Sequence, residues 1–181
     1  MSLPFPATII LLAVLVILAA IWDIRWRRIP NWLTLSGLVL GIGLSWFLGY
    51  PGVRSSLQGL GLAFGVYFVL YLLHGMGAGD VKLMAAVGAT AGMMNWLGIL
   101  FLTSVIGAAA ALLLVLIKGR LRGTVFNLLR IIGSLGRGHA PYKDNPDLDI
   151  ASSAALRLPH GAMIALGTLG FLAAAARWAP K

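Results

Sequence analysis

The chain contains no cysteine and no glutamate among its 181 residues. Without cysteine it can form no disulfide, no thiolate nucleophile and no zinc site built on sulfur. Its acidic residues are five aspartates, and three of them, Asp144, Asp147 and Asp149, share one polar stretch. The other two, Asp23 and Asp80, each stand alone at the end of an apolar run. Because a carboxylate at the edge of hydrocarbon is costly unless it is partnered or protonated, these two are candidates for a functional site.

Charged residues are also scarce: they make up 10% of the chain, whereas hydrophobic residues make up 60% and the mean hydropathy is +0.93. This composition is typical of an all-α, polytopic membrane protein surrounded by lipid. The net charge of +9 does not indicate a nucleic-acid partner, because the cations gather in a few short loops.

Apolar runs long enough to cross a bilayer, about 17–25 residues, mark most of the expected helices. The run from residue 83 to 117 is too long for one span, because its 35 residues would extend about 52 Å as a helix. We therefore expect a break near residues 92–95, preceded by a short fourth helix or by a re-entrant or tilted segment. The other expected spans are residues 3–22, 32–50, 57–73, 96–117 and 158–178, which gives about six transmembrane helices.

Lysine and arginine lie mostly on one side of this arrangement. Eleven of them fall in residues 23–31, 74–82 and 118–157, and three fall on the other side. Because cytoplasmic loops carry the excess of Lys and Arg, these three segments are predicted to be cytoplasmic, with both termini outside. Asp23 and Asp80 are separated by two spans and are therefore expected at the same cytoplasmic face.

The polar region 118–157 contains an apolar stripe at helical spacing: Val125, Leu128, Leu129, Ile132 and Leu135. The stripe predicts an amphipathic segment that lies on the inner leaflet. Its role is either that of a passive surface linker or that of a flap that helps dock a substrate helix. We expect residues 1–181 to form one integral membrane domain, with this loop between its fifth and sixth spans.

Two carboxylates that lie close together cannot both ionise easily, so the pair shares one proton. The ionised carboxylate can then activate a water while the protonated one donates to a scissile carbonyl oxygen, and this chemistry needs no metal or cofactor. Gly77 and Gly79, beside Asp80, are expected to allow unusual backbone dihedrals and the close approach of a substrate backbone. The alternative interpretation is a glycine run that only packs helices.

Three motifs follow one another along nearly the whole chain. They are Asp23-x-Arg25-x-x-x-Ile29-Pro30-Asn31, Gly77-x-Gly79-Asp80-x-Lys82, and Leu158-Pro159-His160-Gly161-Ala162. Together they resemble the two aspartate motifs and the Pro-aromatic-Gly segment of the type IV prepilin peptidases. His160 stands where that family more often has an aromatic residue, and the sequence assigns it no catalytic role.

The resemblance implies an aspartyl protease of the bacterial inner membrane that removes the basic leader of prepilins at the cytoplasmic face. It implies that Asp23 and Asp80 are the catalytic pair, and that Arg25, Asn31 and Lys82 orient them. The substrate would be a prepilin whose apolar helix stays in the membrane. Lys82 could instead be a helix-end cation that snorkels to the interface, and Asn31 only a helix-start signal.

The connection between the first two spans distinguishes two forms of this family. Long forms carry an insert with two Cys-x-x-Cys pairs there and methylate the new pilin N-terminus. Here the connection is about nine residues long and has no cysteine. The chain therefore resembles the short form associated with Flp or tight-adherence pili, and N-methyltransferase activity is not expected.

Two other classes of function use the same residues. Isolated membrane carboxylates also serve proton relays, so a proton-coupled transport component is one alternative. Both aspartates are expected at one interface and no inverted repeat is visible, which disfavours it. The other alternative is a noncatalytic pilus-assembly scaffold, which the two intact aspartate motifs disfavour.

Overall fold

The computed structural model describes residues 6–136 and 158–178, and every regular element in these ranges is an α-helix, as expected. Asp144, Asp147 and Asp149 lie outside the described residues. The helices are α1 (Pro6–Trp26), α2 (Asn31–Leu48), α3 (Val53–Leu72), α4 (Ala78–Ala91), α5 (Met93–Ile117), α6 (Leu121–Gly136) and α8 (His160–Trp178).

Five of these helices, α1, α2, α3, α5 and α8, are long and apolar enough to cross a membrane. The expected break in the long apolar run is confirmed at Gly92, which separates α4 from α5 with a φ of +77°. A Cβ at this position would lie 2.6 Å from Ser55 Oγ and 2.8 Å from Pro51 Cβ. Glycine therefore supplies both the backbone conformation and the space that this break requires.

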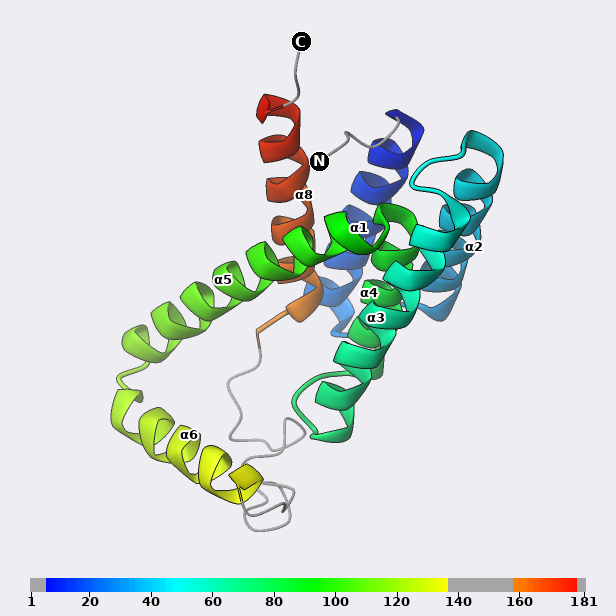
Figure 1. Ribbon diagram of the computed structural model, residues 1–181. Helices are drawn as coiled ribbons and strands as arrows, with labels where there is room; N and C mark the ends of the chain where they lie inside the picture. The colour runs from blue at the N-terminus through cyan, green and yellow to red at the C-terminus, as the bar shows by residue number, and fades with distance from the viewer. Residues whose placement is uncertain (1–5, 137–157, 179–181) are drawn as a thin grey trace.

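The short helix α4 is enclosed by the longer helices. It has 14 residues, and every residue from Leu83 to Ala91 is buried. It packs mainly against α2 and α3 (Figure 1). Small residues allow the close approach to α3, because a Cβ on Gly88 would lie 2.8 Å from the carbonyl carbon of Gly59 and 2.9 Å from Ala63 Cβ. The first turn of α4, which carries Asp80, is therefore fixed by a rigidly packed helix.

The first helix continues further than its apolar run. The sequence predicts that the span ends at Trp22 and that Asp23 begins a loop, but α1 extends to Trp26. The backbone N–H of Arg27 donates to the carbonyl oxygen of Asp23 at 2.9 Å. The prediction was wrong here because helical hydrogen bonds continue regardless of side-chain polarity, whereas the apolar run ends where the helix leaves the membrane region. Asp23 therefore projects from the last turns of a helix.

α1 packs against α8, and α5 packs against α8 and α3, so the last helix lies beside the first (Figure 1). This places the last turns of α1 and the starts of α4 and α8 at the same end of the helical bundle. Asp23 and Asp80 share that end, as the span count predicts. The side of the membrane to which this end belongs stays a prediction.

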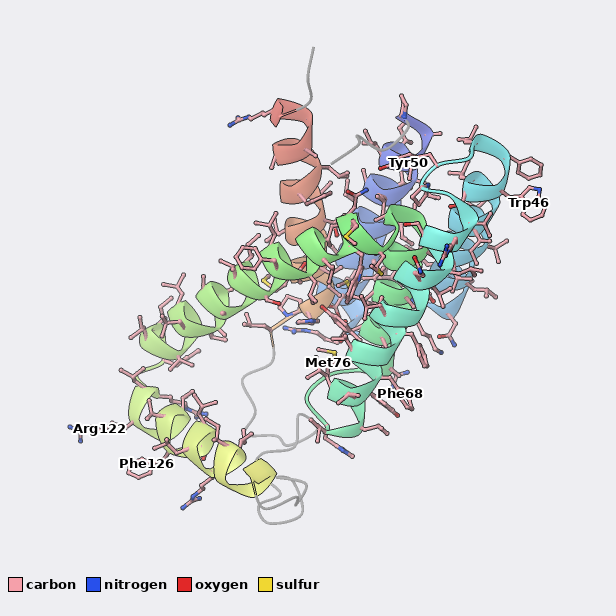
Figure 2. All side chains as sticks on the ribbon, viewed as in Figure 1. Trp46, Tyr50, Phe68, Met76, Arg122 and Phe126 are labelled. Atoms are coloured by element: carbon pink, nitrogen blue, oxygen red, sulfur yellow. The ribbon has the colours of Figure 1, made fainter. Side chains whose placement is uncertain are left out.

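The expected amphipathic helix is present as α6, which follows α5 after a turn at Gly119. Its apolar side chains are exposed, with Leu129 at 61% and Ile132 at 58%. Figure 2 shows Arg122 and Phe126 projecting from α6 away from the other helices. The helix is confirmed, and its place on the membrane surface stays a prediction.

Candidate functional site

The carboxyl of Asp23 is held by the start of α8. Asp23 is 8% exposed, and its Oδ2 accepts a hydrogen bond of 2.8 Å from the backbone N–H of Gly161. Gly161 is the second residue of α8, where backbone N–H groups have no partner within the helix. The positive end of the helix dipole also favours a negative group there. The Asp23 carboxyl, which projects from α1, is therefore fixed by the N-terminus of a different helix, α8.

The absence of a side chain at Gly161 makes this contact possible. A Cβ at this position would lie 3.1 Å from both Cβ and Oδ2 of Asp23, and 3.2 Å from Cδ1 of Ile29. These distances are shorter than ordinary van der Waals contact, so a larger residue would have to displace Asp23 or Ile29. Gly161, the glycine of the third sequence motif, is therefore needed because a side chain there would collide with Asp23 or Ile29.

Asp80 is held by its own helix. It is the third residue of α4, and its Oδ2 accepts a hydrogen bond of 3.2 Å from the backbone N–H of Gly77. In return, the backbone N–H of Asp80 donates to the carbonyl oxygen of Gly77 at 3.1 Å. The bond from Gly77 to the Asp80 side chain is one half of a capping box, and the other bond is a backbone turn bond, because glycine has no side chain to complete the box. Together they set the position of the half-buried Asp80 carboxyl.

The two glycines beside Asp80 require a correction. Gly77 has a φ of −83°, which is ordinary extended backbone, and Gly79 lies within the first turn of α4. The expectation of unusual dihedrals was therefore wrong for both, because the helix start is built from conformations open to any residue. The missing side chain of Gly79 instead lets Ile29 pack closely against the start of α4, because a Cβ there would lie 3.3 Å from Cβ of Ile29.

Ile29 joins the two helix starts. Its buried side chain lies against Gly79 of α4 and Gly161 of α8, and it comes from the short connection between α1 and α2. Through these contacts the helix start that carries Asp80 lies next to the helix start whose Gly161 N–H binds Asp23. The structure therefore brings together the two aspartates that the sequence singles out.

Two aromatic side chains lie at the same end of the bundle as the aspartates, and the sequence analysis assigns neither of them a catalytic role. Tyr67 of α3 is 3% exposed, and its ring centroid lies 6.1 Å from that of His160. His160 directly precedes Gly161, whose N–H binds Asp23, so both rings belong to the end of the bundle that holds the aspartates. Nothing in the apolar run of α3 distinguishes Tyr67 from its aromatic neighbours, so only the fold could reveal it.

Two of the three predicted orienting residues contact each other. The Nζ of Lys82 donates a hydrogen bond of 2.8 Å to Oδ1 of Asn31, and both side chains are exposed. This bond joins the start of α2 to the first turn of α4. Arg25 is exposed, and its guanidinium lies over the ring of Trp26 at 5.3 Å from the centroid. Within the described part of the chain, no hydrogen bond or ion pair joins Arg25 to either aspartate.

A pair of interacting carboxyls can act as acid and base toward one bound molecule. Within residues 6–136 and 158–178, no three side chains of His, Cys, Asp or Glu gather as metal ligands would. The groups at this end of the bundle include the two carboxyls, the rings of Tyr67 and His160, and the exposed Lys82.

The amino-acid sequence is similar to those of several known proteins. A prepilin leader peptidase/N-methyltransferase of Xanthomonas campestris is 32% identical over 109 residues, which are 56% of this chain and 38% of that protein. One of Neisseria gonorrhoeae is 34% identical over 119 residues, which are 62% of this chain and 41% of that protein. The chain spans roughly two-fifths of the length of these relatives. No solved structure matches it.

A match to a protein family covers more than half of the chain. Residues 10–112 match the type IV leader peptidase family, and this range includes both Asp23 and Asp80. It ends before α8, so the contact of Gly161 with Asp23 lies outside the matched residues. The chain belongs to the type IV leader peptidase family.

Proposed function

We propose that this protein is a membrane aspartyl endopeptidase that removes the basic leader peptide from type IV-like prepilins, with Asp23 and Asp80 as its catalytic pair. The observation that carries the proposal is the meeting of these two carboxyls at one end of the bundle, where each is bound by a backbone N–H. Membership of the type IV leader peptidase family supports the class of substrate.

The reaction is general acid–base hydrolysis. One carboxylate removes a proton from water, and the other carboxyl, protonated, donates to the oxygen of the scissile carbonyl as the water attacks. The tetrahedral intermediate then collapses: the carboxyl that took the proton from water gives it to the leaving nitrogen as the C–N bond breaks, and the other carboxylate takes back a hydroxyl proton as the new carboxyl group forms. In both aspartates Oδ2 is bound to a backbone N–H, which orients the carboxyl and leaves Oδ1 for the water or the carbonyl oxygen. Because the pair shares one proton, it is ready for this step without a further group.

We propose a substrate that combines a basic leader with an apolar helix, in keeping with the type IV leader peptidase family. The helix would remain in lipid beside the enzyme while the leader junction enters the aspartate pair. We place the protein in the bacterial inner membrane with the pair facing the cytoplasm, since the Lys- and Arg-rich segments belong to that side. Gly77 would leave room for the substrate backbone near Asp80, whereas the space beside Gly79 is taken by Ile29.

The short connection between α1 and α2 favours the Flp or tight-adherence class of prepilin. Only residues 27–30 separate the two helices, which leaves no room for a cysteine-bearing insert between them. The names of the relatives include N-methyltransferase, but we propose the peptidase activity alone for this chain.

The deciding experiment is co-expression with a prepilin from the same genome, with leader removal read as a mass shift. We expect cleavage by the wild type and none by Asp23→Asn or Asp80→Asn, because each change removes one member of the acid–base pair. Asp147→Asn is the matched control, since it neutralises an aspartate of the polar stretch and is expected to cleave normally. Normal cleavage by Asp80→Asn would exclude the proposed pair.

The two alternative functions predict different results with the same variants. A proton-coupled transport component would give proton flux in proteoliposomes that depends on Asp23 or Asp80. A noncatalytic scaffold would still support piliation when both aspartates are changed to alanine. Either result, with no cleavage by the wild type, would replace the peptidase proposal.

A further inference from the structure

Tyr67 lies on the buried face of α3, and the proposed reaction does not use it. The buried residues of this helix recur every three or four positions and so share one face: Ser56, Gly59, Ala63 and Tyr67. This face packs against α4, because Ser56 Oγ donates a hydrogen bond of 2.6 Å to the carbonyl oxygen of Ala89. Tyr67 is therefore on the side of α3 that is turned toward the helix of Asp80.

The register of the two helices places Tyr67 at the level of Asp80. A Cβ on Gly59 would lie 3.0 Å from the carbonyl carbon of Gly88, so these two glycines mark a point of contact. The helices run in opposite directions, and both Gly59 to Tyr67 and Gly88 to Asp80 are eight residues. Each step covers about 12 Å at 1.5 Å per residue, toward the same end of the bundle. Tyr67 thus lies beside the first turn of α4.

The ring of Tyr67 also adjoins the start of α8. Its centroid lies 6.1 Å from that of His160, the first residue of that helix. The next residue, Gly161, donates its backbone N–H to Asp23. Tyr67 therefore contacts the region where the two helix starts that hold the aspartates come together.

Two polar groups on these neighbouring rings have no partner in the protein. Tyr67 is 3% exposed, and its hydroxyl makes no hydrogen bond within the described part of the chain. In the same part of the chain, the buried Nε2 of His160 also lacks a partner. Burying such groups unpaired costs folding free energy, and native proteins rarely do so without a functional reason. A phenylalanine would fill the place of Tyr67 without that cost, so the hydroxyl is there to bind something other than the protein.

We propose that Tyr67 is a catalytic residue whose neutral hydroxyl donates a hydrogen bond to the oxygen of the scissile carbonyl. That oxygen gains negative charge as water attacks, and a donor already in place stabilises the charge in the transition state. The hydroxyl transfers no proton, because the proton transfers belong to the two carboxyls. The inference rests on the proposed peptidase function and adds to it a group that acts on the transition state.

The test compares Tyr67→Phe with the wild type, both as purified full chains. The change removes the hydroxyl and keeps the ring beside His160. We expect kcat for prepilin cleavage to fall about a hundredfold, the usual loss for one oxyanion donor. KM should change less than about twofold, because the bond strengthens only in the transition state. The Tm should equal or exceed that of the wild type, because the change removes a buried hydroxyl that has no partner.

Tyr71→Phe is the matched control, because Tyr71 lies one turn further along α3 and is 41% exposed. It should keep the wild-type kcat, KM and Tm. A wild-type kcat in Tyr67→Phe would overturn the inference, and so would a lowered Tm, which would show that the hydroxyl has a structural partner. Absence of cleavage by the wild type would reject the proposed function itself, and the role of Tyr67 with it.

A binding measurement tests the same contact without turnover. The probe is a peptide that spans the leader junction of the prepilin and carries a tetrahedral hydroxymethylene group in place of the scissile carbonyl. Its hydroxyl stands where the charged oxygen would form, so we expect Tyr67→Phe to bind it about tenfold more weakly than the wild type. Tyr71→Phe should bind it as tightly as the wild type. Equal affinity in Tyr67→Phe and the wild type would reject the proposed bond.

Discussion

At the scale of single residues, the two carboxyls are positioned by backbone groups rather than by other side chains. Asp23 is held by the N–H of Gly161 and Asp80 by that of Gly77. Backbone donors at helix starts cannot rotate away, so they fix a carboxyl more firmly than a flexible side chain would. The precision of the site therefore depends on where α4 and α8 begin.

Gly161→Ala tests this dependence. The added methyl group would lie 3.1 Å from Asp23 Oδ2, so we expect Asp23 to shift and cleavage to fall about tenfold or more, since small displacements of reacting groups are costly. Overpacking should lower the free energy of unfolding by about 1–3 kcal/mol. Activity is measured as kcat/KM and stability by thermal unfolding.

Gly170→Ala is the matched control on the same helix, because a Cβ there meets nothing within 4 Å. It should leave both cleavage and stability close to wild type. If Gly161→Ala also retained full activity, the N-terminus of α8 would not be what positions Asp23.

Some residues of the site could be predicted from the sequence, and others could not. Asp23 and Asp80 stand out because isolated carboxylates in an apolar chain are costly, and the structure places both at the same end of the bundle. Tyr67 and the bond from Gly161 to Asp23 could not be foreseen in the same way. That bond joins residues separated by 138 positions, and a buried tyrosine leaves no pattern in an apolar run.

At the scale of elements, the order of the helices follows from the lengths of the apolar runs and from the glycine that interrupts the longest of them. The excess length of residues 83–117 predicts the break that Gly92 makes, because no single span can be so long. The helix ends are less predictable, since α1 and α3 both include polar turns beyond their apolar runs. α3 begins at Val53 and takes in Arg54 and Ser56, which hydropathy alone would leave in a loop.

The position of the amphipathic helix α6 on the membrane surface can be tested with single labels. Ile132 and Arg130 lie on different faces of the helix and both are exposed. With single spin labels at Ile132→Cys and Arg130→Cys in bilayers, we expect the first to be accessible to oxygen in lipid and the second to an aqueous nickel chelate. The native chain has no cysteine, so each variant carries one label. Aqueous accessibility at both positions would place α6 away from the lipid surface.

At the scale of the whole molecule, the orientation in the membrane rests on the distribution of Lys and Arg. Arg28 precedes α2 and Arg54 lies in the first turn of α3, so a full span separates them. Labelling from one side of the membrane therefore distinguishes the two positions.

Single cysteines at these two positions give the answer. An impermeant maleimide applied to intact cells should label Arg54→Cys, and it should label Arg28→Cys only after lysis. Both side chains are exposed, so access is not limited by packing. Labelling in the opposite order would place the aspartate pair outside the cytoplasm and would contradict the proposed substrate access.

The bond between Gly161 and Asp23 also has a consequence for the synthesis of the protein. The first helix emerges from the ribosome long before the residue that completes its carboxyl site, because 138 positions separate them. Both aspartates have been synthesised once the ribosome has passed residue 80. Asp23 gains its backbone partner only later, when α8 has joined the bundle. A nascent chain would therefore carry both carboxyls before Asp23 has its backbone partner, and the proposed activity would have to wait until α8 has joined the bundle.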